Sequence, residues 1–510
     1  DKFLAIISSL LFLQLTRFPV LKYTDFTQLV MMPLFFATHW LFIKSPSYKT
    51  SLLLAVVMGL TSLSHSSGFA ACYLTFFLVS LLMFFSFSEI ISFKKTRIKI
   101  NITALRKTAR EKSKYFVTTF IVSFLIAQLY WFEPIFIYHG KTSPHYLEWN
   151  SPDYSNVKYQ FKFLLNSIRD MFLNFSSPIS IFKSLLSILG LGYLLRNIKI
   201  FEVRYFVFLF ITAVIGTFHY FLTIPLMHTH FVPYRLIEML LHPLLPILAC
   251  FGLAFCFLTI EKFLKKNYAE LVSRFIAIIL IVVIFLANLL TFQEYSKKNK
   301  WFSAAKNPLP RYLLEVSEFI RANTDVNDVF LTTNELGFAL NALTGAKLVT
   351  SRRAQADPFM DMDERQLAAA IILYGNDSKK RLELLKKYKV KYLYWDLYWV
   401  RSEYTISRDG KIVNYFDPLL VFDTPTNRKI LEHYNISFIA ITTWVDPALR
   451  GEDFKKFPLL LISPANYRSF SKPWNKDLDR YLKEIWNYTE IYNGKEYEIA
   501  ALYKVEISDI

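Results

Sequence analysis

Cysteine is scarce in this sequence of 510 residues. The three cysteines, Cys72, Cys250 and Cys256, all lie in apolar runs, so no disulfide framework is available. Charge is scarce as well: 20% of residues are charged, whereas 53% are apolar and phenylalanine alone occurs 49 times. This composition excludes intrinsic disorder and collagen-like sequence.

The common motifs of soluble enzymes are also missing. The sequence contains no GxxxxGK followed by Ser or Thr, and no GxGxxG, HExxH, CxxC or GxSxG. Nucleotide hydrolysis, dehydrogenase chemistry and zinc peptidase chemistry therefore have no support in the sequence.

Long apolar runs dominate the first 293 residues, and the mean hydropathy of the whole chain is +0.28. A helix that crosses a membrane needs about 20 mostly apolar residues. The chain starts at Asp1, without Met and inside an apolar run, so we expect it to be a piece of a longer protein. Nine spans are predicted, of which the first and third are short: Phe3–Leu15, Phe26–Ile43, Leu52–Leu63, Gly68–Phe87, Tyr115–Tyr138, Ile179–Leu195, Tyr205–Pro225, Leu236–Leu258 and Phe275–Phe292.

Basic residues favour one orientation of these spans. Residues 1–293 hold 27 Lys and Arg against 12 Asp and Glu. If the chain after Phe292 is extracytoplasmic, the loops on the cytoplasmic side carry 19 Lys and Arg and the opposite loops carry seven. This agrees with the positive-inside rule and predicts a multi-pass protein of the cell membrane. The basic run Lys94–Lys114 is then a contact with anionic lipids, and nucleic acid is not expected as a partner.

Residues 294–510 differ in kind, because their charges are mixed and their apolar runs are short. Strands alternating with helices predict an α/β domain. The fold class is therefore a multi-span α-helical membrane domain of about nine helices (1–293) followed by an extracytoplasmic α/β domain (294–510). The predicted helices are Pro310–Asn323, Leu336–Leu343, Glu364–Tyr374 and Ser378–Tyr388, and the predicted strands are Val329–Thr332, Lys347–Val349, Val390–Tyr394, Ile436–Ile441 and Ile499–Lys504.

Polar residues near the outer membrane boundary are the candidates for a site, because ionisable groups beside spans are costly and often functional. Carboxylates could hold a divalent cation, and an arginine could grip a phosphate or a carboxylate. The candidates are Asp25, Glu133, Glu148, His228, His230 and Arg235.

Each candidate could instead have a structural role. Asp25 could cap the helix that starts at Phe26, and Arg235 could extend its head to the membrane interface. An HxH pair such as His228 and His230 is weak evidence for a metal, and interfacial histidine explains it better. Glu133 precedes Pro134 near a span end, where a solvated carboxylate is unremarkable.

Many spans, acidic outer loops and a C-terminal outer α/β domain together resemble the GT-C membrane glycosyltransferases. Within that superfamily the chain is most similar to the catalytic subunit of oligosaccharyltransferase and its archaeal counterparts. The stretches that carry the resemblance are Asp25-Phe26-Thr27 with the following spans, Tyr234-Arg235-Leu236 through Pro243 and Pro246, and Ile320–Arg353 with Asp328-Val329-Phe330-Leu331 and Gly337.

The sequence departs from this family at two motifs. The second outer loop of the family reads Asp-x-Glu, with both acids serving the metal, whereas here Asp25 is followed by Thr27. The acceptor-reading signature WWDYG is replaced by Thr333-Asn334-Glu335-Leu336-Gly337. The family's first acidic loop would lie before Asp1, and Glu133 and Glu148 are the candidate stand-ins for a later one.

The resemblance implies a transferase that moves a sugar or glycan from a polyprenyl-phosphate-linked donor to an extracytoplasmic acceptor, protein or glycan. Its implied cofactor is a divalent cation, Mg or Mn, with Asp25 as a ligand, and Asp25, Glu133 and Glu148 as the catalytic acids. Arg235, His228 and His230 would bind substrate. The alternative is a non-catalytic membrane scaffold or glycan-binding relative, which Thr27 and the missing WWDYG favour. A transporter fits less well, because no internal symmetry is visible.

Overall fold

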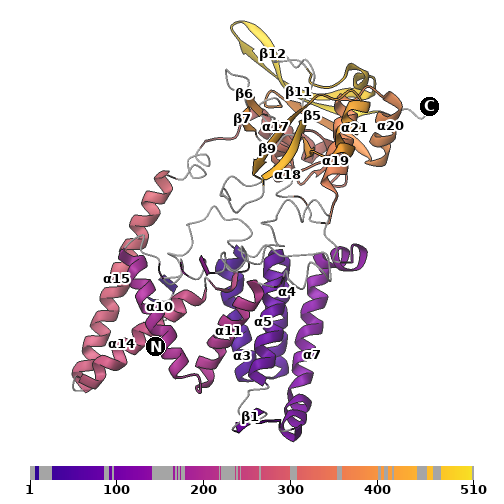
Figure 1. Ribbon diagram of the computed structural model, residues 1–510. Helices are drawn as coiled ribbons and strands as arrows, with labels where there is room; N and C mark the ends of the chain where they lie inside the picture. The colour runs from indigo at the N-terminus through magenta and orange to yellow at the C-terminus, as the bar shows by residue number, and fades with distance from the viewer. Residues whose placement is uncertain are drawn as a thin grey trace. The chain divides into compact units, whose positions relative to one another are not determined.

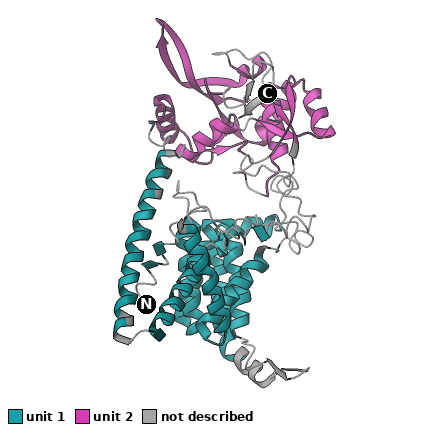
Figure 2. Cartoon of the chain, turned by 60° about the vertical axis from the view of Figure 1, so that its left-hand side comes forward, with its two compact units in different colours: residues 1–141, 154–307 teal, residues 142–153, 308–510 magenta. Residues whose placement is uncertain are grey.

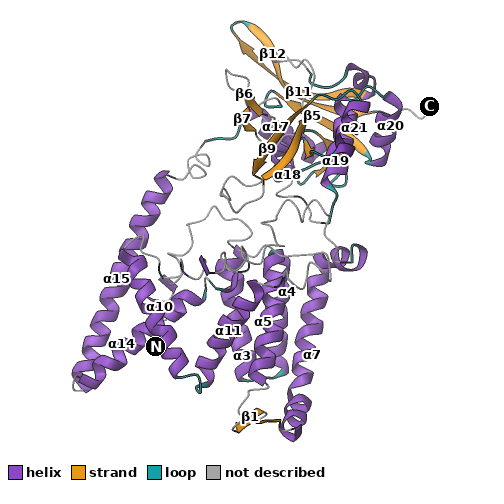
Figure 3. Cartoon of the chain, viewed as in Figure 1, coloured by secondary structure: helices purple, strands orange, loops and turns teal. Residues whose placement is uncertain are grey.

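The chain forms two compact units, coloured separately in Figure 2. Unit 1 comprises residues 1–141 and 154–307, and unit 2 comprises residues 142–153 and 308–510. Helices dominate unit 1, and most of the strands belong to unit 2 (Figure 3). The computed structural model describes residues 26–84, 91–94, 97–100, 102–139, 178–217, 243–263, 266–298, 307–352, 359–399, 404–406, 412–415, 419–444, 456–462 and 472–507, apart from a few positions within these ranges, and some isolated positions between them.

Unit 1 is built from helices and one short hairpin (Figure 1). The basic run Lys94–Lys114 lies in this hairpin and in the first turns of the helix α7 (Ile102–Phe132). The elements are the π-helical turn η1 (Thr27–Met31), α3 (Met32–Lys44), α4 (Tyr48–Ser64), α5 (Ser66–Phe84), β1 (Ile91–Lys94), β2 (Arg97–Ile100), α7 (Ile102–Phe132), the π-helical turn η2 (Glu133–Ile137), α10 (Pro178–Arg196), α11 (Phe201–Thr217), α14 (Leu244–Phe263) and α15 (Lys266–Lys298).

Four of the described helices are long and apolar enough to cross a membrane, by length and composition. They correspond to the predicted spans that begin at Gly68, Tyr115, Leu236 and Phe275, whereas the full set of nine stays a prediction. The four segments are Ser66–Phe84, Arg110–Ile137, Leu244–Phe263 and Leu271–Glu294. The last helix, α15, continues beyond residue 293 to Lys298, and the domain boundary drawn there from the sequence stays a prediction.

Some buried polar side chains in unit 1 pair with one another. The fully buried His39 of α3 hydrogen-bonds through Nδ1 to the hydroxyl of Tyr205 on α11, at 2.9 Å, and through Nε2 to the hydroxyl of Ser80 on α5, at 3.0 Å. The imidazole also stacks on Phe35. A buried polar group is costly unless it is hydrogen-bonded, so this network holds three helices together in one arrangement.

Helices α10 and α14 cross with their backbones in close contact. A Cβ atom on Gly190 would overlap the carbonyl oxygen of Leu248, and one on Gly252 would overlap that of Leu186. Ser187 of α10 reaches across the same crossing and donates a hydrogen bond to the carbonyl of Leu245 at 3.4 Å. Small residues at a crossing let apolar helices approach closely, which is how helices associate where hydrophobic burial cannot drive them together.

Unit 2 contains a five-stranded mixed sheet in the order β11-β12-β5-β3-β4, in which β3 is parallel to β4 and β5. The three-stranded antiparallel sheet β8-β10-β9 and the pair β6–β7 complete the strands described. The elements are α17 (Arg311–Asn323), β3 (Val329–Leu331), α18 (Asn334–Thr344), β4 (Lys347–Leu348), α19 (Met362–Tyr374), α20 (Ser378–Lys387), β5 (Val390–Asp396), β6 (Tyr404–Ile406), β7 (Ile412–Tyr415), β8 (Leu420–Phe422), α21 (Pro425–His433), β9 (Phe438–Trp444), β10 (Lys456–Ile462), the 3₁₀ turn η5 (Lys476–Tyr481), β11 (Leu482–Tyr492) and β12 (Lys495–Val505).

Local signals set the helix ends of unit 2. Thr333, Asp361, Asp377 and Thr424 each cap a helix, because their side chains accept a hydrogen bond from a backbone N–H in the first turn. Gly345 ends α18 with a φ of 74°, a left-handed conformation that glycine adopts without strain. All nine elements predicted here from the sequence are confirmed, within a few residues at their ends.

The core of unit 2 draws its buried side chains from Tyr312 to Tyr503 and includes the fully buried Trp395 and Trp399. Beside Trp395, the carboxylate of Asp396 accepts hydrogen bonds from the hydroxyl of Tyr394 at 2.9 Å and from the backbone N–H of Tyr398 at 2.8 Å. Burial raises the pKa of Asp396 to about 6, although both hydrogen bonds oppose the shift. Ionised Asp396 therefore weakens the fold at neutral pH.

We expect leucine at Gly190 or Gly252 to force α10 and α14 apart. Overpacking of this kind should lower the melting temperature of the protein in detergent by roughly 5–10 °C. Gly192→Leu is the matched control, because no atom lies within 4 Å of a Cβ at that position of the same helix. Leucine favours a helix over glycine, so the control should melt at the same temperature or higher. Equal melting of all three variants would contradict the close crossing.

We expect residues 308–510, expressed alone, to unfold cooperatively and to lose stability as pH rises from about 4 to about 7. Asp396 has a raised pKa in the folded state, so it binds its proton more tightly there than in the unfolded chain, and that advantage disappears once the folded group ionises. Asp396→Asn should reduce this loss and stabilise the unit at pH 7.5 by at most roughly 3 kcal/mol, measured by urea unfolding.

Asp423 provides a control of opposite sign. Its carboxylate pairs with Arg428 at 2.5 and 2.6 Å, and the hydrogen bond from Arg428 holds the pKa of Asp423 below its usual value. Asp423→Asn should therefore destabilise the unit at neutral pH, and this effect should fade as the pH is lowered and the carboxylate is protonated. A fragment with no cooperative transition, or one whose pH dependence is unchanged by Asp396→Asn, would refute the prediction.

Candidate functional site

Most of the site residues expected from the sequence fall outside the described part of the chain. These are Asp25, Glu148, His228, His230 and Arg235. Glu133 is the expected site residue that the structure describes, and the residues that follow Asp25 are described as well.

Glu133 opens the π-helical turn η2 at the end of α7, with Pro134 buried behind it. Its side chain is exposed and accepts a hydrogen bond from the hydroxyl of Tyr138 at 3.2 Å. The carboxylate is thus oriented by a neighbouring phenol while it stays open to solvent, an arrangement in which it can accept a proton or bind a cation.

Thr27, two residues after Asp25 in the chain, is fully buried. Its hydroxyl donates a hydrogen bond of 2.8 Å to the hydroxyl of Ser64, which in turn donates to the carbonyl of Thr61 at 2.7 Å. Gly68 lies against it so closely that a Cβ there would come within 2.8 Å of the methyl group of Thr27. Thr27 therefore ties η1 to the turn between α4 and α5.

That turn, Ser64-His65-Ser66-Ser67, is polar. His65 separates α4 from α5 and accepts a hydrogen bond through Nδ1 from the backbone N–H of Ser67 at 3.0 Å. The indole of Trp131, near the end of α7, donates to the carbonyl of Ser62 at 3.0 Å and stacks on Phe69. Hydroxyl, imidazole and indole groups thus gather where η1, α4, α5 and α7 meet. We call Thr27, Ser62, Ser64, His65, Ser67 and Trp131 the polar end of unit 1.

A metal site cannot be assembled from the described residues. In the ranges that the structure covers, no group of three or more His, Cys, Asp or Glu side chains is arranged to hold a metal ion. A divalent cation takes six or more oxygen ligands, some of them water, and Glu133 supplies a single carboxylate. The divalent cation expected from the family resemblance stays a prediction.

The position of the missing WWDYG signature is occupied by residues with structural tasks. Thr333 caps α18, and the carboxylate of Glu335 forms a two-pronged ion pair with Arg352, one of whose bonds is 2.6 Å long. Burial raises the pKa of Glu335, and the pairing with Arg352 opposes that rise.

The remaining residues of this segment pack into unit 2. The amide oxygen of Asn334 accepts a hydrogen bond from Gln366 at 3.0 Å, and Leu336 is buried in the core. A Cβ on Gly337 would crowd Leu348 at 3.0 Å. The segment Thr333–Gly337 therefore builds the start of a helix and binds it to its neighbours.

Comparison with known proteins gives structural neighbours only. No family model matches the sequence, and no curated protein matches it. The structure is similar to three structures of the oligosaccharyltransferase of Archaeoglobus fulgidus: one tethered to an acceptor peptide with an NVT sequon (TM-score 0.31, 10% identity), one of AglB with an inhibitory peptide and a dolichol-phosphate (0.30, 11%), and one in the apo form (0.31, 9%).

Each of these matches covers 78% of this chain and 56% or 57% of the other, so the chain spans a little over half the length of these neighbours.

Proposed function

We propose that this chain is part of an integral-membrane glycosyltransferase that moves a sugar or glycan from a polyprenyl-phosphate-linked donor to an extracytoplasmic acceptor such as a protein. The observation that supports the proposal best is the polar end of unit 1. Polar side chains gather there at one end of α4 and α5, and one of them, Thr27, follows Asp25 by two residues in the chain.

A donor of this kind has two parts with opposite solvent preferences. Its hydrocarbon chain belongs in the bilayer, and its phosphate and sugar belong at the surface. An enzyme for it must therefore present polar and charged groups at the end of an apolar helical bundle. The described helices of unit 1 have this character, and the predicted site residues all lie near outer span ends in the sequence.

The transfer is a direct displacement at the anomeric carbon of the sugar. The acceptor atom forms a bond to that carbon while the bond from the carbon to the phosphate oxygen breaks, and the departing polyprenyl phosphate keeps the electron pair. In this proposal Asp25, Glu133 or Glu148 positions the acceptor and takes its proton, and Arg235 with His228 and His230 binds the phosphate or an acceptor carboxylate. A divalent cation, when bound, would offset the charge of the departing phosphate.

A non-catalytic, glycan-binding relative is the second candidate. The buried hydrogen bond between Thr27 and Ser64 favours it. Thr27 stands where the family has its second acid, and here this residue packs the helices together. The structural roles of Thr333–Gly337 point the same way. Both candidates need a chain that is embedded in the membrane.

We expect Asp25→Asn to reduce sugar transfer by roughly a hundredfold or more, the range in which positioned acids and bases contribute to catalysis. The assay uses membranes that contain the full-length protein, with the total lipid-linked sugar extract of its source cells as donor and labelled sugar as the readout. Glu111→Gln is the control, because Glu111 is an exposed carboxylate of α7 far along the helix from Glu133.

Elution at the same volume in detergent shows that both variants are folded. Full transfer by Asp25→Asn would exclude the assigned role. Lipid-linked sugar that binds to the unmodified protein without any transfer would favour the non-catalytic relative.

We expect Ser113 and Lys379 to lie on opposite sides of the membrane. Ser113 lies in the basic first part of α7, and Lys379 is an exposed residue of α20 in unit 2. In a variant whose three native cysteines are replaced by serine, Ser113→Cys should react with an impermeant maleimide only after the cells are opened, and Lys379→Cys should react in intact cells. Labelling from the same side would disprove the proposed orientation.

A further inference from the structure

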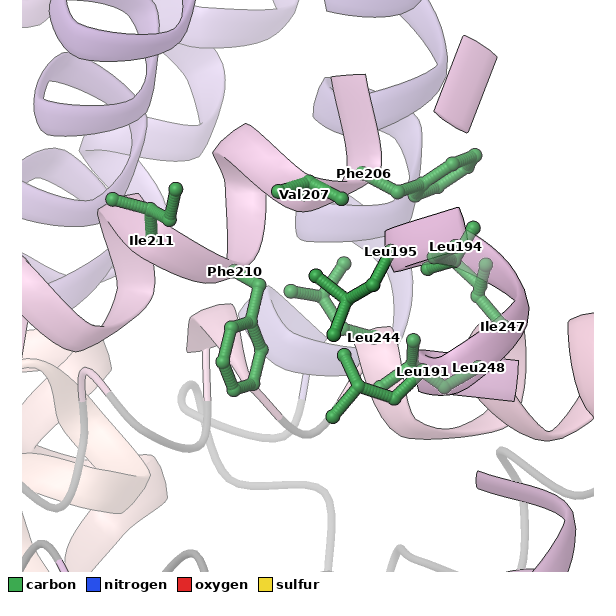
Figure 4. A pocket seen from close by; sticks show the side chains of 10 residues that line it. All are labelled: Leu191, Leu194, Leu195, Phe206, Val207, Phe210, Ile211, Leu244, Ile247 and Leu248. Atoms are coloured by element: carbon green, nitrogen blue, oxygen red, sulfur yellow. The ribbon is translucent and has the colours of Figure 1, made fainter. Parts of the chain in front are cut away.

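Two features of the described structure have no part in the proposed function. One is an apolar cavity of about 240 Å³ between α10, α11 and α14, lined by side chains such as Leu194, Phe210 and Leu248 (Figure 4). All of the residues that line it are aliphatic or aromatic, so it offers no group that could react or bind a charge. The other is a set of surface asparagines in unit 2, whose side-chain amides are groups that a cell can modify.

These asparagines belong to a short sequence pattern. Asparagine, then any residue except proline, then serine or threonine is the acceptor pattern for a glycan on the asparagine nitrogen. The pattern occurs five times in the sequence. Asn101 and Asn174 lie outside the described residues, whereas Asn376, Asn435 and Asn487 belong to unit 2 and are exposed. A glycan is bulky and needs a surface position, which all three of the described asparagines provide.

Asn435 lies in the turn that ends helix α21. Its φ is 53°, a left-handed conformation that asparagine tolerates better than most residues. The backbone N–H of Asn435 donates to the carbonyl of Glu432 at 3.0 Å, and that of Ile436 donates to the carbonyl of Leu431 at 2.9 Å. These two bonds form the Schellman motif, which satisfies carbonyl groups in the last turn of a helix. The backbone of the turn is therefore held by its own hydrogen bonds, and the Asn435 side chain is not needed for it.

The acceptor pattern at Asn435 has both of its reactive positions on the surface. Its middle residue, Ile436, is buried in the core of unit 2, and Asn435 and Ser437 on either side are exposed. Among the residues that the structure describes, neither the Asn435 amide nor the Ser437 hydroxyl has a hydrogen-bond partner. Both groups that the pattern requires are thus free to meet an enzyme.

At Asn376 the hydroxyl of the pattern is already bound. Ser378 is the first residue of α20, and its hydroxyl donates to the carboxylate of Asp477 at 3.2 Å. The middle residue, Asp377, caps the same helix by accepting a hydrogen bond from the N–H of Lys380 at 2.9 Å. An enzyme that recognises the hydroxyl would have to break the first bond and disturb the start of the helix, which costs free energy.

At Asn487 both groups of the pattern are bound. The amide of Asn487 donates to Glu484 at 2.7 Å, and the hydroxyl of Thr489 donates to Glu496 at 2.7 Å. Both Asn487 and Thr489 also pair with β12 in the sheet. This segment would have to give up side-chain bonds and leave the sheet to enter an enzyme, whereas the segment at Asn435 lies between a helix and a strand.

We propose that Asn435 is a glycosylation site that the fold of unit 2 favours over Asn376 and Asn487. The donor is a polyprenyl-phosphate-linked glycan, and a glycosyltransferase of the same membrane carries out the transfer. The anomeric carbon of the glycan bonds to the amide nitrogen of Asn435 while its bond to the phosphate oxygen breaks. The nitrogen loses a proton to a base of the transferring enzyme, and the departing lipid phosphate keeps the electron pair. The proposal rests on the proposed function in one respect, the extracytoplasmic location of unit 2.

The test measures the fraction of each asparagine that carries a glycan, by mass spectrometry of peptides from the full-length protein purified from membranes of its source cells. We expect a glycan on most copies of Asn435 and on few copies of Asn376 or Asn487. Asn435→Gly should remove it and leave the protein folded, because glycine is the residue best suited to a left-handed turn at a helix end.

Variants of the hydroxyl test the pattern without touching the asparagine. Ser437→Ala should lower the glycan on Asn435 about tenfold or more, because the enzyme loses a hydrogen bond and keeps an unsatisfied group. Ser437→Thr should retain the glycan, since the hydroxyl remains. Thr489→Ala is the matched control, which removes the hydroxyl of another pattern and should leave the glycan on Asn435 unchanged.

The orientation of unit 2 is checked in the same cells through the labelling of Lys379→Cys. If that cysteine reacts in intact cells and Asn435 carries no glycan, this proposal is overturned and the orientation stands. If it does not react and Asn435 carries no glycan, both are overturned. Equal glycan on all three asparagines would also overturn the proposal, because the fold would then have no influence on the choice. A glycan on Asn435 of a protein that transfers no sugar itself would support the proposal and favour the non-catalytic relative.

Discussion

The absence of water among apolar helices is the constraint on which unit 1 depends. Where no water is available, each buried polar group must find a partner in the protein or remain costly. His39 meets this demand through Tyr205 and Ser80, and Thr27 meets it through Ser64. The same pairs decide which helices are neighbours, so polar groups specify the arrangement while apolar surface keeps the helices in the bilayer. The demand is not met everywhere, because the buried hydroxyls of Thr75 and Thr212 have no hydrogen-bond partner among the described residues.

Unit 2 also provides hydrogen-bond partners for its buried polar groups. Its surface is polar and its core is built on a sheet, so these partners come from side chains and from the backbone. The buried carboxylate of Asp363 accepts hydrogen bonds from the side chain of Asn427 and from the backbone of Phe422. The fully buried guanidinium of Arg381 donates to the carbonyls of Ile372 and Gly375. These contacts join segments far apart in the sequence. Asp396 is the costly case, since its hydrogen bonds only partly offset burial.

Sequence patterns predicted the elements that carry a strong local signal. Helices with caps, such as α18 between Thr333 and Gly345, and buried strands such as β5 were expected nearly to the residue. The long edge strand β11 was not, because it is largely exposed and shows no clear apolar alternation. Neither was the crossing at Gly190 and Gly252, because a glycine on one helix does not reveal which helix lies against it. For the candidate site, Asp25 and Glu133 could be proposed from position in the chain, whereas the burial of Thr27 depends on three segments meeting.

The burial of Thr27 limits how this chain can perform the chemistry of the family that it resembles. A glutamate at that position would have to displace the hydrogen bond to Ser64 and enter a space that Gly68 has left only wide enough for a methyl group. The carboxylate would be buried without a partner, at a cost of several kcal/mol. The packing of η1 against α4 and α5 therefore excludes a second acid next to Asp25. In the proposed function, a further carboxylate that cooperates with Asp25 would come from another segment, and Glu133, which is exposed and accepts a hydrogen bond from Tyr138, is a described candidate.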